Sequence, residues 1–317
     1  MTNSVNRTQA VIENNTQTEL ATGLLEDHAR IAPKFFYDGL GSVLFEAICQ
    51  LPEYYLTRTE HQILQRNLAE MAHGIVAGST LIDLGAGNCA KAAGLFPHLH
   101  PEQYVPIDIS EAHLTEAVQR LQQRFPHIEM TPLGMDFSGR WSLPALVRNN
   151  RRLFFYPGSS IGNFDPQAAL EFLKNIHAEC DSEGGILIGV DLVKDSAVLN
   201  SAYDDDLGVT AAFNLNVLRH VNQILGTDFD IRQWRHVAFF NADKSRIEMH
   251  LEATINLDVR WGNQRRHFIA GERIHTENSY KYTTARILEL LEGAGFHKPR
   301  YWTDESGWFA VIHAQAR

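Results

Sequence analysis

With 317 residues, 44% of them hydrophobic and 21% charged, the chain has an ordinary globular composition and enough length for two domains. Its formal net charge of −10 excludes a general nucleic-acid binder, because no basic stripe is available to neutralise phosphates. Cys49, Cys89 and Cys180 are widely spaced without a CxxC motif, which excludes a disulfide framework and a zinc site and is typical of a reducing compartment.

Residues 1–19 are polar and lack the apolar core of a signal peptide, and no run approaches the length of a membrane span. We therefore expect a flexible N-terminal arm over residues 1–19, a cytoplasmic location and no membrane partner. The 15 histidines show no metal-ligand spacing, so no metal site is predicted. No heptad or repeat indicates an obligate assembly, and we expect a monomer.

The pattern from residue 20 to residue 62 is mostly helical and contains a dense aromatic segment. Tyr37, Tyr54 and Tyr55 lie in it beside acidic and basic side chains. A packed helix pair with tyrosine hydroxyls at its surface would explain the segment. A lid that carries hydrogen-bonding tyrosines over a pocket would explain it equally well, and the local pattern does not decide between them.

Strands and helices alternate from residue 80 onwards. Strands are expected at residues 81–84, 103–108, 128–133, 153–156 and 185–192, with helices at 90–98, 112–125 and 168–178. Ser110 is the expected N-cap of the second of these helices. The alternation predicts a parallel α/β sheet, which binds ligands at the carboxyl ends of its strands. Gly85, Asp108, Asp136 and Asn163 fall at those ends.

The pattern changes after residue 195. A long helix is expected at 202–225, antiparallel strands at 234–241, 245–257 and 266–275, and then a helix at 283–293 and a strand at 308–313. The last two elements suit the first sheet. We therefore predict a nucleotide-type core over residues 60–196 plus 284–317, and a second α+β domain over residues 20–59 plus 197–283.

The stretch from residue 80 to residue 91 carries the clearest ligand signal. A buried strand breaks into Gly85 and Gly87, whose lack of a Cβ permits positive φ and a close approach of the ligand. The run formally satisfies G-x-G-x-x-A, and Asp108 lies at the spacing of a ribose-binding acid, so an NAD-dependent dehydrogenase is one interpretation.

Three details favour S-adenosylmethionine (SAM) over NAD. Asp83 precedes Gly85 by two residues, and its carboxylate suits a cationic amino-acid end and would repel a pyrophosphate. The motif starts near residue 80, whereas many NAD domains open with it. Asp136 and Phe137 could bond and stack an adenine. The expected fold is therefore a class I (Rossmann-like) SAM-dependent methyltransferase core with a second, substrate-binding domain.

Several blocks of the chain carry a more specific resemblance. They are FYDGLGSVLFE at 36–46, LPEYYLTRTE at 51–60, YPGSSIGNF at 156–164, YDD at 203–205, GVTAAFNLN at 208–216, IEM at 247–249 and ENSYKY at 277–282. In this order they closely resemble the EgtD family, the L-histidine Nα-methyltransferases of ergothioneine biosynthesis. The resemblance covers nearly the whole chain after residue 20.

The resemblance implies a role for individual residues. The positions that hold SAM correspond to Tyr37, Gly85, Lys91, Asp108, Asp136 and Phe137, beside Asp83 and Gly87 of the loop motif. Those that hold the carboxylate and α-amino group of the acceptor correspond to Tyr54, Asn163 and Tyr203, and those that read the imidazole to Met249, Glu277 and Ser279. No strong general base is identifiable, and Tyr37 is our candidate for relaying the proton.

The implied reaction is methylation of the α-amino group of L-histidine by SAM, to Nα,Nα,Nα-trimethylhistidine (hercynine). A related enzyme for a tryptophan-like amino acid or a histidine derivative is the first alternative, although it would be expected to lack the acid–serine pair Glu277 and Ser279. An inactive binding protein should show erosion of the glycine loop or its acids, and none is seen. A titration with SAM against NAD would test the dehydrogenase alternative.

Overall fold

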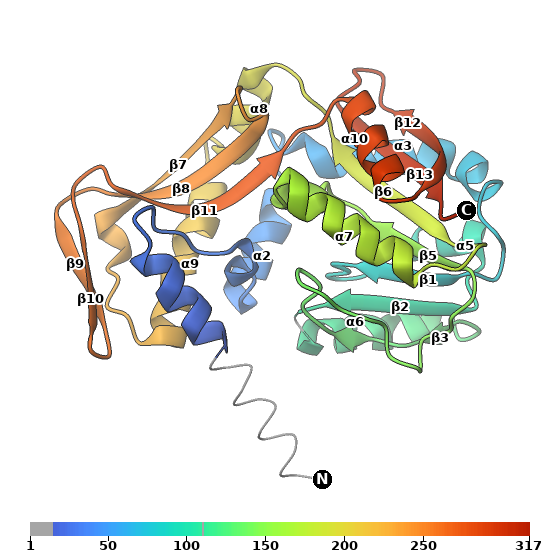
Figure 1. The fold of residues 1–317 in the computed structure, drawn as a ribbon, viewed down its shortest axis with the longest axis horizontal. Coiled ribbons are helices and arrows are strands. Elements are labelled where there is room, and N and C mark those ends of the chain that lie inside the picture. The colour runs from blue at the N-terminus through green and yellow to red at the C-terminus, as the bar shows by residue number, and fades with distance from the viewer. Residues whose placement is uncertain (1–14, 110) are drawn as a thin grey trace, which may run out of the picture. The chain divides into compact units, whose positions relative to one another are not determined.

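The computed structural model describes residues 15–109 and 111–317, so most of the predicted N-terminal arm and the predicted cap Ser110 lie outside the described residues. The described chain forms two units (Figure 1). The core unit comprises Tyr55–Lys194 and Ser279–Arg317. The accessory unit comprises the described residues up to Tyr54 together with Asp195–Asn278. The predicted cofactor and substrate roles of the two domains remain proposals.

The core unit is built on a mixed sheet with the order β12-β13-β6-β5-β1-β2-β3, and β4 also pairs with β2. The strands are β1 (Thr80–Leu84), β2 (Gln103–Asp108), β3 (Glu129–Met130), β4 (Leu133–Gly134), β5 (Arg152–Tyr156), β6 (Gly185–Asp191), β12 (His297–Thr303) and β13 (Phe309–Gln315). Neighbours among β6, β5, β1 and β2 pair in parallel, whereas β13 pairs antiparallel with β6 and with β12. The predicted α/β, Rossmann-like fold is confirmed.

The central strands β1, β5 and β6 are buried along their whole length, because helices cover both faces of the sheet (Figure 1). On one face, side chains of β1, β2, β5, β6 and β13 form a single buried cluster with α7 (Pro166–Glu179) and α10 (Thr284–Gly293). The other helices of the unit are α3 (Tyr55–Ala72), α4 (Ala90–Ala93), α5 (Phe96–Leu99), α6 (Glu111–Arg124) and the 3-10 helix η2 (Ser160–Asn163).

Three expectations for the core unit were wrong in detail. The helix predicted at 90–98 is two short helices, α4 and α5, and the second begins at Phe96 with Pro97 in its first turn. The strand predicted at 128–133 is split into β3 and β4 around Pro132, which has no N–H for the sheet. The edge strand β12 was not predicted, because its sequence is polar and mostly exposed.

The accessory unit combines helices with a three-stranded antiparallel sheet of order β11-β8-β7 and a separate hairpin (Figure 1). Residues 15–25 are also helical. The other elements are η1 (Pro33–Phe36), α2 (Gly39–Ile48), α8 (Ser196–Tyr203), α9 (Val209–Leu225), η3 (Ile231–Gln233), β7 (Trp234–Asn241), β8 (Arg246–Ala253), β9 (Leu257–Trp261), β10 (Gln264–Phe268) and β11 (Arg273–Tyr280). The last two residues of β11 belong to the core unit.

Two expectations for the accessory unit also need correction. The helix predicted at 202–225 is interrupted, because Asp205 caps a new helix, α9, and Gly208 adopts a φ of 73° directly before it. The β9–β10 hairpin falls where the prediction had the tail of one strand and the start of the next. It turns at Gly262, whose φ is 51°.

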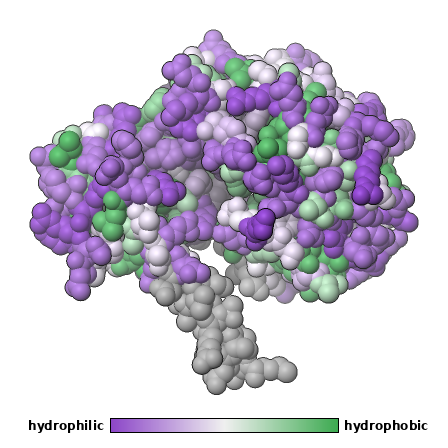
Figure 2. Space-filling model, viewed as in Figure 1, coloured by the Kyte–Doolittle hydropathy of each residue, from purple (hydrophilic) through white to green (hydrophobic). Residues whose placement is uncertain are grey.

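The described surface is mostly hydrophilic on the face drawn in Figure 2. Hydrophilic side chains dominate there, and hydrophobic ones are scattered among them. None of the helices in the described part of the chain is both long and apolar enough to cross a membrane.

Candidate active site

The glycine loop is fastened to the neighbouring strand β2. The N–H groups of Gly85 and Ala86 both donate to the carbonyl of Ile107, at 2.9 and 3.1 Å. Gly85 and Gly87 have φ values of 74° and 51°, as the motif predicts. The Gly87 N–H donates to Oδ2 of Asp108 at 2.9 Å. The structure therefore brings two of the predicted cofactor residues, Gly87 and Asp108, into direct contact at the carboxyl ends of β1 and β2.

Asp83 is packed inside the unit, with 2% of its surface exposed. Its Oδ2 accepts a hydrogen bond from the Tyr104 hydroxyl at 2.8 Å, and its buried Oδ1 has no hydrogen-bond partner among the described residues. Burial raises the pKa of this carboxyl to about 7, although the Tyr104 bond and the nearby Lys91 ammonium oppose the shift. The repulsion of a pyrophosphate is thus weaker than the sequence argument assumed, since the group is only partly ionised at neutral pH.

Lys91 lies at the start of α4 and is held by an acid that sequence reasoning missed. Its Nζ is 2.6 Å from Oε2 of Glu60 on α3, and Oε1 of Glu60 accepts the Gly158 N–H at 2.7 Å. Glu60 stands on the apolar face of α3, among the buried Leu56 and Ile63. An acid at a core-facing helical position was the signal that could have identified it.

The predicted adenine-binding pair follows β4. The ring of Phe137 borders the glycine loop, since a Cβ placed on Gly85 would lie 3.8 Å from its Cζ. Edge-on and tilted contacts with Tyr156 and Phe172, at 6.2 and 6.1 Å between ring centroids, fix the ring. Oδ1 of Asp136 accepts from the N–H and the hydroxyl of Ser138, which orients that carboxylate.

Two of the residues predicted to bind the amino-acid substrate, Asn163 and Ser279, also lie in the core unit, on adjoining segments. Asn163 ends η2, and the preceding Gly162 packs against the end of β11. A Cβ on Gly162 would lie 2.7 Å from the carbonyl oxygen of Tyr280 and 3.5 Å from Oγ of Ser279. Ser279 is buried, and its Oγ accepts a hydrogen bond from Lys281 Nζ at 2.9 Å. The structure thus places the Asn163 and Ser279 segments side by side.

Three of the predicted tyrosines, Tyr37, Tyr54 and Tyr203, lie together in the accessory unit, whereas Tyr55 begins α3 of the core unit. Tyr54 contacts the rings of Phe45 and Tyr203, at 6.3 and 6.1 Å between centroids, and Phe45 contacts Tyr37 at 5.7 Å. Burial raises the pKa of Tyr54 well above its usual value, with smaller contributions from Tyr203, Cys49, Glu277 and Tyr37. The hydroxyl of Tyr54 therefore stays protonated and can donate. The packed-helix interpretation expected this hydroxyl at the surface, whereas Tyr54 is buried.

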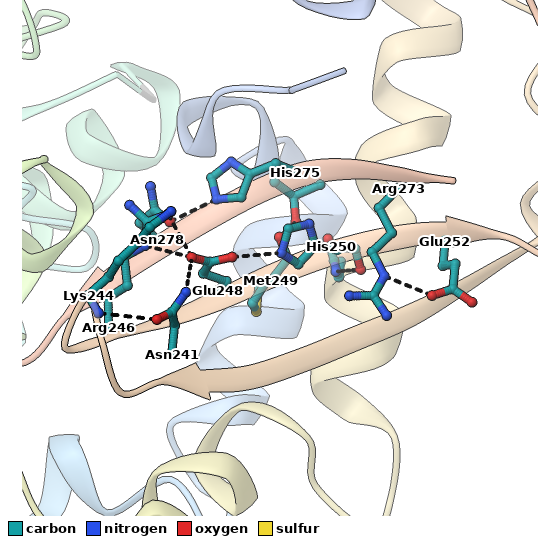
Figure 3. Close-up of polar contacts among 12 residues, drawn as sticks. Asn241, Lys244, Arg246, Glu248, Met249, His250, Glu252, Arg273, His275 and Asn278 are labelled. Carbon is teal, nitrogen blue, oxygen red and sulfur yellow. Dashed lines mark hydrogen bonds and ion pairs between the residues drawn. The ribbon is translucent and has the colours of Figure 1, made fainter. Parts of the chain in front are cut away.

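Met249 and the residues beside it in β8 point to opposite sides of the sheet (Figure 3). Met249 is 1% exposed, and its carbonyl accepts from the Thr276 hydroxyl at 3.1 Å. On the other side Glu248 accepts from Arg246 at 2.6 Å and from His250 at 3.2 Å. Met249 is therefore a packed side chain, which is compatible with a structural role, a binding role, or both.

The donor set in the core unit fits SAM. The cofactor has one anionic group, its carboxylate, and cationic ammonium and sulfonium groups. Lys91 supplies a cation, Asp83 supplies a buried oxygen that has no donor in the described structure, and the Phe137 ring borders the glycine loop. No group of three or more His, Cys, Asp or Glu side chains among the described residues could hold a metal ion.

Comparisons with known proteins agree on one family. The sequence model of the family described as "histidine-specific methyltransferase, SAM-dependent" matches residues 16–316. A histidine N-alpha-methyltransferase of Mycobacterium tuberculosis is 38% identical, over 92% of this chain and 92% of that protein. Ergothioneine biosynthesis protein 1 of Neurospora crassa is 32% identical, over 98% of this chain but 36% of that longer protein.

A relative that is named for a different methyl acceptor is the 4-dimethylallyltryptophan N-methyltransferase of Trichophyton verrucosum. It is 28% identical, over 92% of this chain and 91% of that protein. The family match spans both units, from the first described helix to the last strand of the core sheet, and it takes in every candidate residue named above. This chain belongs to the family of SAM-dependent, histidine-specific methyltransferases.

Proposed function

We propose that this chain transfers methyl groups from SAM to the α-amino nitrogen of L-histidine, and that repeated transfer yields Nα,Nα,Nα-trimethylhistidine (hercynine). The observation that carries the acceptor assignment is the set of buried Tyr54 and Tyr203 hydroxyls near Glu277 in a histidine-specific family. Neutral hydroxyl donors suit a carboxylate, and an acid suits the N–H of an imidazole.

The reaction is an in-line displacement at carbon, for which SAM supplies the electrophilic methyl group on a sulfonium when it is bound. The protein therefore has to orient the amine and let it lose a proton, because an ammonium has no lone pair. Asp108 and the glycine loop would hold the adenosine end, and Lys91 would hold the carboxylate end. Phe137 would cover the adenine ring, and the carboxylate of Asp136 would accept a hydrogen bond from the adenine amino group.

The acceptor amino acid requires groups that bind both of its charged ends. Asn163 has both a donor and an acceptor, so one side chain can bond the carboxylate and the amino group. Tyr54 and Tyr203 would donate to the carboxylate. Glu277 and Ser279 would bond the two imidazole nitrogens, and Met249 would contact the ring.

Tyr37 is proposed to relay the proton that each methylation step releases. It is the C-cap of η1, one residue before the N-cap of α2, and its ring packs edge-on against Phe45 and Phe213 in the accessory unit. The test is the pH profile of turnover by a Tyr37→Phe variant. A loss of turnover that is largest at low pH supports the relay, whereas full turnover at every pH would remove Tyr37 from the mechanism.

The decisive experiment is mass spectrometry of L-histidine incubated with the protein and SAM. A gain of three methyl groups is the expected result. A second candidate function, methylation of a tryptophan-like amino acid, is supported by the dimethylallyltryptophan enzyme among the relatives. No gain on histidine together with a gain on tryptophan or a prenylated tryptophan would replace the main proposal by this one.

A further inference from the structure

The buried carboxylate of Glu60 joins two loops of the core unit. Glu60 is 1% exposed on α3, and each of its oxygens has a different partner. Oε2 binds the ammonium of Lys91 at 2.6 Å, and Oε1 accepts the backbone N–H of Gly158 at 2.7 Å. Lys91 follows the glycine loop, and Gly158 lies in the segment that leads from β5 into η2 and Asn163.

The residues around Glu60 leave space for its carboxylate and satisfy its charge. A buried carboxylate is costly unless it is paired and hydrogen-bonded, and Glu60 is both. The space around Oε1 exists because position 189 in β6 is a glycine. A Cβ on Gly189 would lie 1.9 Å from Oε1 and 3.1 Å from Cδ of Glu60. A side chain at position 189 would therefore displace the carboxylate from its two partners.

We propose that Glu60 is a positioning residue for the cofactor: it directs the Lys91 ammonium at the carboxylate of SAM and fixes the Gly158 segment in register with the glycine loop. The inference rests on the proposed function, because it takes Lys91 as a residue that binds SAM. Glu60 itself acts through Lys91 and the Gly158 amide. Its carboxylate accepts one N–H of the Lys91 ammonium. The carboxylate of SAM, the only anionic group of that cofactor, is a suitable acceptor for another N–H of the same ammonium.

The proposal predicts that replacing Glu60 weakens the binding of ligands that carry the amino-acid end of SAM and spares ligands that lack it. A Glu60→Gln side chain keeps an amide oxygen that can accept from Gly158, but it presents an NH₂ group to a lysine that only donates. We expect calorimetric Kd values for SAM and S-adenosylhomocysteine to rise about tenfold or more, the worth of a charge-assisted hydrogen bond. The Kd for 5′-methylthioadenosine, which lacks the amino-acid end, should change less than about twofold.

A second variant perturbs Glu60 without altering it. Gly189→Ala pushes the carboxylate aside, so it should show the same selective loss for the ligands that carry an amino-acid end. Glu70→Gln is the matched control, since Glu70 lies on the same helix but forms an exposed pair with Arg300 at 2.5 Å. We expect all three ligands to bind this control as they bind the unaltered protein.

Glu60→Asp completes the series, because it keeps the charge and should recover part of the affinity for S-adenosylhomocysteine. Equal losses for all three ligands in Glu60→Gln, or no loss for any, would overturn the proposal. If Glu60→Gln does not fold by circular dichroism, the ligand pattern of Gly189→Ala decides. Selective loss in a chain that does not methylate histidine would leave this inference standing and remove the proposed acceptor. A chain that binds neither SAM nor S-adenosylhomocysteine would refute both.

Discussion

The acids at the ends of β1 and β2 are in different environments, although the sequence presents them as one motif. Asp108 bonds the backbone of the glycine loop, whereas Asp83 is enclosed and bonded to Tyr104. Burial raises the pKa of Asp83 to about 7, so the folded protein binds a proton there that the unfolded chain releases near pH 4. Asp83 therefore reduces stability as the pH rises from about 4 to 7.

Asp83→Asn should remove this pH dependence. The amide keeps an acceptor for the Tyr104 hydroxyl and carries no charge, so without ligand we expect a gain of about 2–4 kcal/mol at pH 8 and little change at pH 4. Urea unfolding at pH 4, 6 and 8 measures the difference. The control is Asp243→Asn, which makes the same change at an exposed position. A constant difference across the pH range would contradict the burial argument.

Glu277 is the residue on which the acceptor assignment can be tested most directly. We expect Glu277→Ala to weaken histidine binding by about 1.5–3 kcal/mol, the worth of a charge-assisted hydrogen bond, and to leave SAM affinity nearly unchanged. Calorimetry with each ligand separates the two effects. Unchanged histidine affinity would refute the role of Glu277 in reading the imidazole.

Asp108→Ala should have the opposite pattern. It removes the acceptor of the Gly87 N–H and loosens the loop, so SAM affinity should fall at least about tenfold. Histidine affinity, measured at saturating cofactor, should change little. A larger effect on histidine than on SAM would show that Asp108 does not belong to the cofactor site.

At the scale of elements, the N-terminus of α9 explains why the helix predicted at 202–225 is interrupted, and it has a stability that can be tested. The carboxylate of Asp205 accepts from the N–H groups of Val209 at 2.9 Å and Thr210 at 2.7 Å and thereby starts α9. Burial opposes ionisation of this carboxyl, but the bonds from Thr210 and Val209 prevail and lower its pKa. The stabilisation is therefore present at neutral pH and is lost as the pH falls below about 4.

Asp205→Ala should cost about 1–2 kcal/mol at pH 7, because the first turn of α9 loses its cap. Asp205→Asn keeps an acceptor and should cost less. Denaturant unfolding at pH 7 and pH 3 measures both variants, and the cost of Asp205→Ala should shrink at pH 3. Equal stability of the alanine variant and the unaltered chain at pH 7 would mean that the cap does not support the helix.

The elements that the sequence predicts well have a strong pattern. β2 and β7 have the predicted bounds, since buried or alternating apolar residues define them. The split of the helix at 202–225 and the missed strand β12 have another cause. The capping bonds of Asp205 and the edge pairing of β12 with β13 depend on backbone geometry and on residues elsewhere, which periodicity does not report.

At the scale of the whole molecule, the candidate site depends on residues that are distant in sequence. Glu60 and Gly158 are 98 positions apart, and Ser279 reaches Gly162 from the far end of the chain. Motif and resemblance singled out the loop, the acids and the candidate histidine-binding residues, because these occur in recognisable blocks, and their roles remain proposals. Glu60 lies in one of those blocks, but its partners are set by the packing of α3 on the core sheet.

Ligand binding should stabilise the whole chain by mass action. SAM at about 100 times its Kd should add about 2.7 kcal/mol and raise the unfolding midpoint by several degrees. NAD at the same concentration should leave it unchanged. Differential scanning fluorimetry with each ligand measures the unfolding midpoint. A rise of the midpoint with NAD but not with SAM would favour the dehydrogenase alternative.

The glycine at position 189 has an evolutionary consequence. Because its missing side chain is the space that the Glu60 carboxylate occupies, the two positions cannot change independently. A larger residue at 189 fits without displacing the side chain at position 60 only where that side chain is shorter. Among related sequences, the pair should therefore vary together, and loss of the acid at 60 would remove the closest of the contacts that require the glycine, leaving that with Phe309 at 3.1 Å.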